Sequence, residues 1–191
     1  MSPIAAVLIA ALAIGSPSEK PIAGAATTRL PAHYEMATLS GGCFWTLQET
    51  LRNIPGVIKT TVGYTGGTVP NPTYEMVASG KTGHTEAVEV IFDPAKLSYE
   101  RLLTDFLTLR NPTWRATDSI GRSHRSAIFY HNEEQRQIAG RVKEKINQSG
   151  KWNAPVVTDI TPATKFYPAE AYHQNYLQRI FAARTCRMAP N

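Results

Sequence analysis

Apolar and polar residues follow two different periods along this chain. Alternation with β-branched residues predicts strands at Val57–Tyr64 and Glu86–Phe92. Between Ser98 and Leu109 the apolar residues instead recur at helical spacing, and the Ser98 side chain is suited to cap the N-terminus of a helix. The face that we expect this helix to bury consists of Leu102, Leu103, Phe106 and Leu107.

The remaining elements follow from the same patterns and from turn signals. We expect further strands at Ala37–Ser40, Ser126–Tyr130 and Val156–Thr161. We expect further helices at Cys43–Asn53, Asn132–Gly150 and Ala169–Phe181. Thr65–His84 and Asn111–Ser123 are predicted loops, and loops of this length are usually functional. The order β-α-β-β-α-β, then α-β-α, predicts an α+β fold: a ferredoxin-like split βαβ plait, in which a mixed sheet carries helices on one face, with an extra C-terminal strand and helix and a mobile tail.

The N-terminus differs in composition from the rest of the chain. Ile4–Ile14 is an uninterrupted apolar run, too short to span a bilayer comfortably but typical of the core of a signal peptide, although no Lys or Arg precedes it. We therefore expect an exported protein, periplasmic or secreted; the alternative is a cytoplasmic protein with a flexible leader. The predicted parts are a leader and linker over 1–34, a single domain over 35–181 and a flexible tail over 182–191 that carries Cys186.

Composition places the chain among globular proteins. Its 191 residues suffice for one domain with a core, and 42% of them are hydrophobic and 18% charged. The formal net charge of +5 comes from 20 basic and 15 acidic residues, which are scattered, with no run of five or more Lys or Arg. We therefore predict a solvated basic surface, no nucleic-acid partner, no stable membrane association and a monomer.

The stretch Gly41-Gly42-Cys43-Phe44-Trp45 is the most informative candidate for chemistry. A thiol at the predicted start of a helix lies beside unpaired backbone N–H groups and the positive end of the helix dipole, which favour the reactive thiolate. The two aromatic residues after it can form an apolar socket suited to a methyl or thioether group. The alternatives are a buried structural thiol and two ordinary core aromatics.

Two further candidates flank the predicted loop at 65–84. Tyr74 is either a surface aromatic or a side chain that points toward Cys43. Glu86 is either an exposed carboxylate at a strand end, the usual location for a Glu, or a buried acid. A buried Glu has a raised pKa and holds its proton near neutrality, so in that case it is suited to general acid catalysis.

The remaining reactive side chains leave several functions open. His173 lies on a predicted helix, where a structural, hydrogen-bonded role is favoured over catalysis, although a Cys-His-Asp hydrolase is possible from the residue inventory. Cys186 is either an incidental thiol or a resolving partner for Cys43, since a flexible end can bring its sulfur to a distant site. No metal site is predicted, because the chain has only two cysteines, no CxxC and no HxxxH pair.

Several motifs in the same order and spacing resemble those of the A-type peptide methionine sulfoxide reductases. The resemblance covers roughly Met36 to Cys186, and five such motifs together are far more specific than any one of them. The motifs are Gly42–Trp45, Pro55–Val57 with Val62–Gly67, Asn71–Tyr74, Thr82–Val88, and Phe166–Glu170 with Tyr172–Gln174.

The resemblance implies a reaction, the thiol-dependent reduction of methionine (S)-S-oxide, free or in proteins, for the repair of oxidised proteins. Cys43 would attack the sulfoxide sulfur, while Phe44 and Trp45 would hold the methyl group. Glu86 and Tyr74 would hydrogen-bond the sulfoxide oxygen, with Glu86 donating a proton.

The resemblance also implies how the enzyme would be regenerated. Methionine would leave Cys43 as a sulfenic acid, which Cys186 would convert to a disulfide. An external thioredoxin-like dithiol would reopen that disulfide, and no bound cofactor is implied.

The chain departs from the family pattern at three positions. Gln48 stands where the family usually has Glu, so any local ion pair is lost there. His124 stands where a second oxygen-binding Tyr is expected; it can still donate a hydrogen bond, but with a different reach and pKa. The family's Asp is displaced by one position, with Ser119 in its place, and whether Asp118 takes the shifted substrate-binding role stays open.

Two other functions compete with the reductase. Because the second hydroxyl is missing, the chain is alternatively a non-catalytic binder of oxidised methionine. A thiol peroxidase is the third hypothesis, and it would react with peroxide directly.

Overall fold

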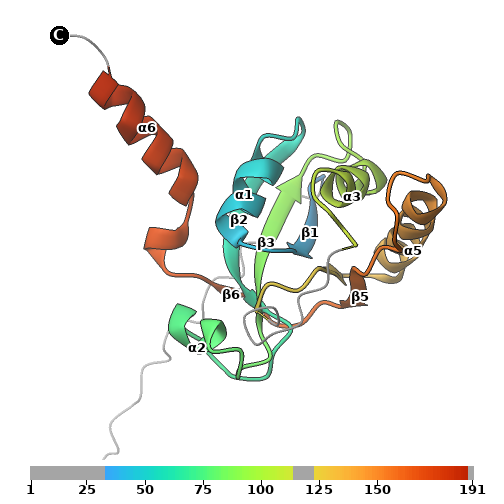
Figure 1. Ribbon diagram of the computed structural model, residues 1–191, viewed down its shortest axis with the longest axis horizontal. Coiled ribbons are helices and arrows are strands. Elements are labelled where there is room, and N and C mark those ends of the chain that lie inside the picture. The colour runs from blue at the N-terminus through green and yellow to red at the C-terminus, as the bar shows by residue number, and fades with distance from the viewer. Residues whose placement is uncertain (1–32, 114–122, 189–191) are drawn as a thin grey trace, which may run out of the picture.

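Six strands form one sheet at the centre of the molecule (Figure 1). The computed structural model describes residues 33–113 and 123–188, with the backbone alone for 183–188. The strands lie in the order β5-β4-β1-β3-β2-β6. Their bounds are Glu35–Ser40 for β1, Val57–Thr65 for β2, Thr85–Phe92 for β3, Ala127–Tyr130 for β4, Asp159–Pro162 for β5 and Tyr167–Pro168 for β6.

The four inner strands confirm the predicted plait. β1 pairs antiparallel with both β3 and β4, and β3 pairs antiparallel with β2, which is the strand order of a split βαβ fold. β5 adds a parallel strand beside β4, and β6 adds an antiparallel strand beside β2. The sheet is therefore mixed, as the α+β prediction requires.

The helices cover the sheet as their apolar faces dictate. α1 and α3 lie over the same face of the sheet, and α5 packs against α3 and the β4–β5 edge (Figure 1). The Ser98 side chain caps α3 by accepting from the N–H of Arg101, as predicted, and the predicted buried face of this helix is in the core. The bounds are Phe44–Arg52 for α1, Tyr74–Ala78 for α2, Tyr99–Thr108 for α3, Glu133–Gln148 for α5 and Tyr176–Met188 for α6.

Three element predictions need correction. The predicted loop Thr65–His84 contains the short helix α2, which Thr73 caps through the N–H of Met76. The strand expected at Val156–Thr161 begins only at Asp159, because the N–H of Val157 bonds to Pro112 and not to β4. β6 was missed, since two residues of which one is proline carry no strand pattern.

The C-terminal helix prediction, Ala169–Phe181, was wrong at both ends. A single turn of 3-10 helix spans Ala171–His173, and Asn175 then takes a left-handed backbone conformation (φ 52°) before α6 begins. α6 crosses the predicted boundary of the mobile tail at residue 182 and continues to Met188. Cys186 therefore lies within a helix that extends away from the sheet (Figure 1).

The predicted leader lies almost entirely outside the described residues, which begin at His33. Within the part of the chain that the structure describes, no helix is long and apolar enough to cross a bilayer.

Candidate active site

Cys43 lies at the junction between β1 and α1, as its N-cap residue. The turn into the helix needs the left-handed backbone of Gly42 (φ 74°), whose N–H donates to the carbonyl of His124 at 3.0 Å. The thiol carries no disulfide, and the residue is exposed. A nucleophile at this position is open to a substrate from solvent.

The protonation state of the resting thiol differs from the prediction. Partial desolvation by the surrounding protein raises the pKa of Cys43 above its ordinary value, and the charge of Glu86 raises it further. The backbone N–H groups of Trp45 and Thr46 lower this pKa, which is the helix-start effect expected from the sequence. Desolvation outweighs that effect, so the prediction of a favoured thiolate was wrong for the resting protein.

Glu86 is the carboxyl group that lies next to this thiol. It is 3% exposed on β3, and its Oε2 accepts a hydrogen bond at 2.9 Å from the N–H of Phe44, the residue after Cys43. Burial raises the pKa of Glu86, while the Phe44 N–H and the charge of His124 oppose that rise. The structure thus brings the predicted acid and nucleophile together although they are far apart in sequence.

An aromatic cluster forms one side of the site. The ring of Phe44 lies with its centroid 6.3 Å from Trp45, 6.5 Å from Tyr74 and 5.9 Å from Tyr64. Phe44 is only 1% exposed and belongs to the core, whereas Trp45 is half-buried and keeps surface for a ligand. Tyr176 of α6 stacks on Trp45 at a centroid distance of 3.9 Å.

Tyr74 begins α2, its side chain is half-buried, and its ring stacks with that of Phe44 at a centroid distance of 6.5 Å. Burial raises its pKa first, and the negative charges of Glu86 and Cys43 raise it further. The phenol therefore stays protonated through the neutral range and can donate a hydrogen bond.

Two further residues, Glu170 and His173, hold this cluster in place. Glu170 accepts from the Tyr64 hydroxyl at 2.8 Å and from the Tyr74 N–H at 3.0 Å. His173 is 1% exposed, and its Nδ1 accepts from the indole N–H of Trp45 at 3.0 Å. His173 thus has the structural role favoured from the sequence. The only signal for Glu170 was its place in one of the motifs.

The three departures from the family pattern have different outcomes. Nε2 of His124 lies 3.4 Å from Oε1 of Glu86, so His124 borders the site at the position of the expected Tyr. The buried amide of Gln48 donates to the Thr60 carbonyl and accepts from the Asn175 N–H. Gln48 therefore makes neutral hydrogen bonds at the position where the family's Glu could form an ion pair. Asp118 and Ser119 lie outside the described residues.

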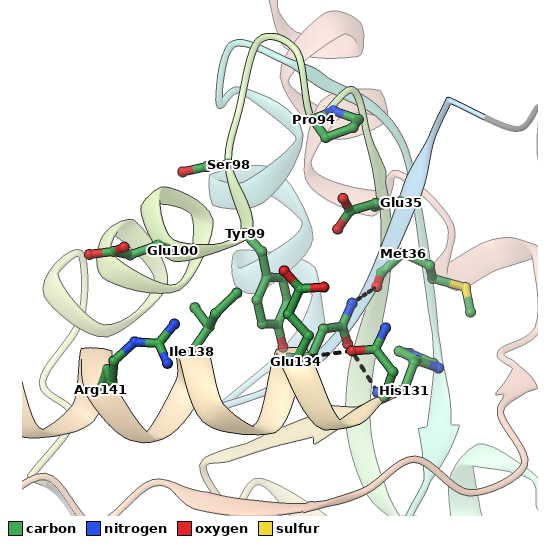
Figure 2. A pocket seen from close by; sticks show the side chains of 12 residues that line it. Glu35, Met36, Pro94, Ser98, Tyr99, Glu100, His131, Glu134, Ile138 and Arg141 are labelled. Carbon is green, nitrogen blue, oxygen red and sulfur yellow. Dashed lines mark hydrogen bonds between the residues drawn. The ribbon is translucent and has the colours of Figure 1, made fainter.

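Two cavities are relevant to ligand binding. The smaller, about 260 Å³, opens beside Cys43 between α1 and α3. The larger, about 630 Å³, lies between β1, α3 and α5, with Glu35, Tyr99 and Glu134 in its lining (Figure 2). Glu35 begins β1 and Cys43 follows its far end, so the larger cavity is remote from the thiol. Within the described ranges, no group of three or more His, Cys, Asp or Glu is placed to hold a metal ion.

Comparison with known proteins agrees with this geometry. Residues 35–191 match the sequence profile of the family described as peptide methionine sulfoxide reductase, and the chain belongs to that family. The chain is similar to two proteins named peptide methionine sulfoxide reductase MsrA. That of Listeria innocua is 50% identical over 76% of this chain and 83% of its own length, and that of Methanosarcina acetivorans is 47% identical over 76% and 78%.

Two solved structures share the fold. Methionine sulfoxide reductase A of Corynebacterium diphtheriae superposes with a TM-score of 0.67 at 32% identity, covering 85% of this chain and 82% of that one. Reduced Mxr1 from Saccharomyces cerevisiae superposes with a TM-score of 0.72 at 29% identity, covering 78% and 87%. The hydrolase suggested by the residue inventory has no counterpart among these relatives.

Proposed function

We propose that this chain reduces methionine (S)-S-oxide, free or in proteins, to methionine. The observation that carries the proposal is the position of a buried acid beside the nucleophile: Glu86 accepts a hydrogen bond from the backbone N–H of Phe44, directly after Cys43. A sulfoxide oxygen leaves only when it is protonated, so the reaction needs both groups at one sulfur atom. The half-buried Trp45 supplies an apolar surface for the methyl group, and Tyr74 a phenol for the oxygen.

The reaction proceeds in three balanced steps. The Cys43 thiolate attacks the sulfoxide sulfur and Glu86 passes its proton to the sulfoxide oxygen. The bond between that oxygen and the substrate sulfur then breaks, the hydroxyl group is transferred to the Cys43 sulfur as a sulfenic acid, and methionine leaves. The thiol of Cys186 then displaces that oxygen as water and forms a disulfide with Cys43. A thioredoxin-like dithiol reduces the disulfide, and its own two thiols are oxidised in exchange.

The charge state of Glu86 affects how readily the Cys43 thiol ionises. An ionised Glu86 raises the pKa of Cys43, so a proton on Glu86 removes that obstacle to thiolate formation. The reactive form in this proposal therefore carries one proton, on Glu86, and a thiolate that the N–H groups of Trp45 and Thr46 stabilise. That form already holds its proton where the leaving oxygen needs it.

A single-turnover assay on the two separated sulfoxide epimers tests the function. The reduced protein, mixed with a peptide that contains the S epimer and with no added reductant, is expected to form one equivalent of methionine and to lose both free thiols. With the R epimer, no methionine should form and both thiols should stay free. Thiol titration and peptide mass spectrometry measure both quantities.

The same assay separates the competing functions. A non-catalytic binder would consume neither thiol with either epimer. A thiol peroxidase would lose its thiols to peroxide alone and ignore the sulfoxide. Cys43→Ser is the control, because it removes the nucleophile and should abolish methionine formation; methionine formed by that variant would refute the role of Cys43.

A second prediction concerns the pH dependence set by His124. Cationic His124 lowers the pKa of Glu86, and a tyrosine at this position carries no positive charge. His124→Tyr is therefore expected to raise the pKa of Glu86, so the decline in single-turnover rate with rising pH moves to higher pH. The exposed His33 gives the control His33→Tyr, which should leave the profile unchanged. An unaltered pH profile of the single-turnover rate in His124→Tyr would contradict the effect of His124 on the pKa of Glu86.

A further inference from the structure

The cavity beside Cys43 has one charged residue in an otherwise apolar setting. Leu47 and Leu51 of α1 and Phe106 and Leu109 around α3 form much of its wall, and Cys43 lies on its rim. Leu109 is 60% exposed, so the cavity opens to solvent through an apolar edge. Arg110, which follows α3 in the chain, closes the other side.

The guanidinium of Arg110 is held firmly in this wall. It lies over the ring of Phe106 at 4.1 Å, and its Nη2 donates to the Ser126 hydroxyl at 2.7 Å. It also packs directly against Gly41, where a Cβ atom would lie only 1.4 Å from Nη1. Because Gly41 has no side chain, the Arg110 cation can pack against the backbone two positions before Cys43.

This cation has no acidic partner among residues 33–113 and 123–182. None of the ion pairs there includes Arg110, and its buried Nε has no hydrogen-bond partner. Burial lowers the pKa of Arg110 to about 10, so the side chain is still a cation at neutral pH. A desolvated cation is costly unless an anion pairs with it, and a hydrogen bond from a guanidinium to a carboxylate is charge-assisted and therefore strong.

We propose that this cavity is a substrate subsite, in which Arg110 binds a carboxylate that lies close to the sulfoxide in the substrate. The inference rests on the proposed function, since it assumes that a methionine sulfoxide meets Cys43. The carboxylate has two possible sources: the α-carboxylate of free or C-terminal methionine sulfoxide, or the side chain of an acidic residue next to it in a polypeptide.

The direction of the substrate supports this placement. The sulfoxide sulfur carries a methyl group and the rest of the methionine side chain. The sulfoxide sulfur is pyramidal, so with the methyl group against Trp45 the remaining side chain diverges from the aromatic cluster. The cavity between α1 and α3 is available to that side chain, because it includes Cys43 but is lined by Thr46 and Leu47 and not by the aromatic cluster. Apolar walls suit the methylene groups, and Arg110 suits the carboxylate beyond them.

Matched substrates that differ only in charge test the proposal. The first pair is N-acetyl-methionine (S)-S-oxide and its carboxamide; the second is a capped peptide with Glu or Gln directly after the sulfoxide. We expect the unmodified protein to favour the charged member of at least one pair by about tenfold, mainly through KM, as a charged hydrogen bond implies. The pair that shows the preference identifies the source of the carboxylate.

Arg110→Gln is expected to lose this preference by weakening the reduction of the charged substrate and leaving the neutral one nearly unchanged. Arg101→Gln is the matched control, because Arg101 is an exposed arginine on α3 whose partner is Asp105. Gly41→Ala offers an independent variant, since the added Cβ displaces the guanidinium while the chain keeps its charge. It should lose the same preference.

Two results would overturn the subsite. One is equal kcat/KM for both members of each pair in the unmodified protein. The other is an equal loss on charged and neutral substrates in Arg110→Gln, which indicates a structural role that thermal unfolding would also report. Failure of the proposed function looks different, because then no member of either pair is reduced at all.

Discussion

Glutamine in place of Glu86 is expected to slow single-turnover sulfoxide reduction by about two to four orders of magnitude, the usual contribution of a general acid. The amide oxygen can still accept the hydrogen bond from the Phe44 N–H, so the local backbone is retained. The variant lacks only the proton that the leaving oxygen requires. Rapid-quench measurement of methionine formation at several pH values checks this prediction.

The pH dependence gives the prediction a second readout. Burial raises the pKa of Glu86, and the acid form is the active one, so the rate of the unmodified protein falls as the pH rises through that value. Glu86→Gln has nothing to titrate there and should lose this decline. Glu89→Gln is the matched control on β3, because burial also raises the pKa of Glu89; a loss in Glu89→Gln equal to that in Glu86→Gln would contradict the assignment.

Stability should change in the opposite direction to activity. A carboxyl group with a raised pKa in the folded protein stabilises the fold while it is protonated, and this contribution is lost as the pH rises through the folded-state pKa. Above that pH the neutral glutamine avoids the cost of a buried anion. Glu86→Gln should therefore be at least as resistant to thermal unfolding at alkaline pH, so reduced activity cannot be ascribed to unfolding.

Serine in place of Cys186 is expected to abolish turnover driven by thioredoxin while it leaves the first turnover intact. The chemistry at Cys43 does not need the second thiol, so one equivalent of methionine should still form. A dithiol protein reductant needs a disulfide to attack, and without Cys186 the product is a sulfenic acid. A small monothiol can reduce that sulfenic acid, so it should still support cycling.

The position of α6 makes this second step conformational. Ten residues separate Tyr176, which stacks on Trp45, from Cys186, and an intact helix spaces them by about 15 Å. A disulfide requires Cα atoms within about 7 Å. In the proposed mechanism we therefore expect α6 to unwind when Cys186 reaches Cys43, and far-UV circular dichroism should show less helix in the oxidised protein than in the reduced one.

The oxidised Cys186→Ser variant is the control for that spectral change, since its sulfenic acid leaves α6 free of any tether. Full thioredoxin-driven turnover by this variant would contradict the resolving role of Cys186, and a helix signal unchanged by disulfide formation would contradict the unwinding of α6.

Local sequence determined much of the fold. The period-two pattern at β2 and β3 and the apolar stripe of α3 were predicted because backbone geometry makes successive side chains alternate or share a face. The single turn at Ala171–His173 and the two-residue β6 were missed. Their stability depends on distant contacts, such as the hydrogen bonds between the Gln174 amide and the backbone of Val62, which no local pattern encodes.

Some residues of the candidate site were likewise predictable from local sequence, and others depend on tertiary packing. The turn at Gly42, the cysteine at a helix start and the aromatic residue beside it are local features, so the sequence singled them out. Motif spacing also predicted Glu86 and Tyr74 as partners of Cys43. The lining role of Arg110 carried no sequence signal, because it depends on the packing of the Arg110 side chain against Gly41, which is distant in sequence.

The sequence by itself thus singled out the candidate side chains for the chemistry and the plait of four inner strands that positions them. The tertiary structure alone decided their protonation and their surroundings. Burial raises the pKa of Cys43 although it begins a helix, Phe44 becomes core while Trp45 stays accessible, and Cys186 lies on a helix. The physical reason is that the solvation of a group depends on every chain segment packed around it, whereas a sequence pattern reports only its near neighbours.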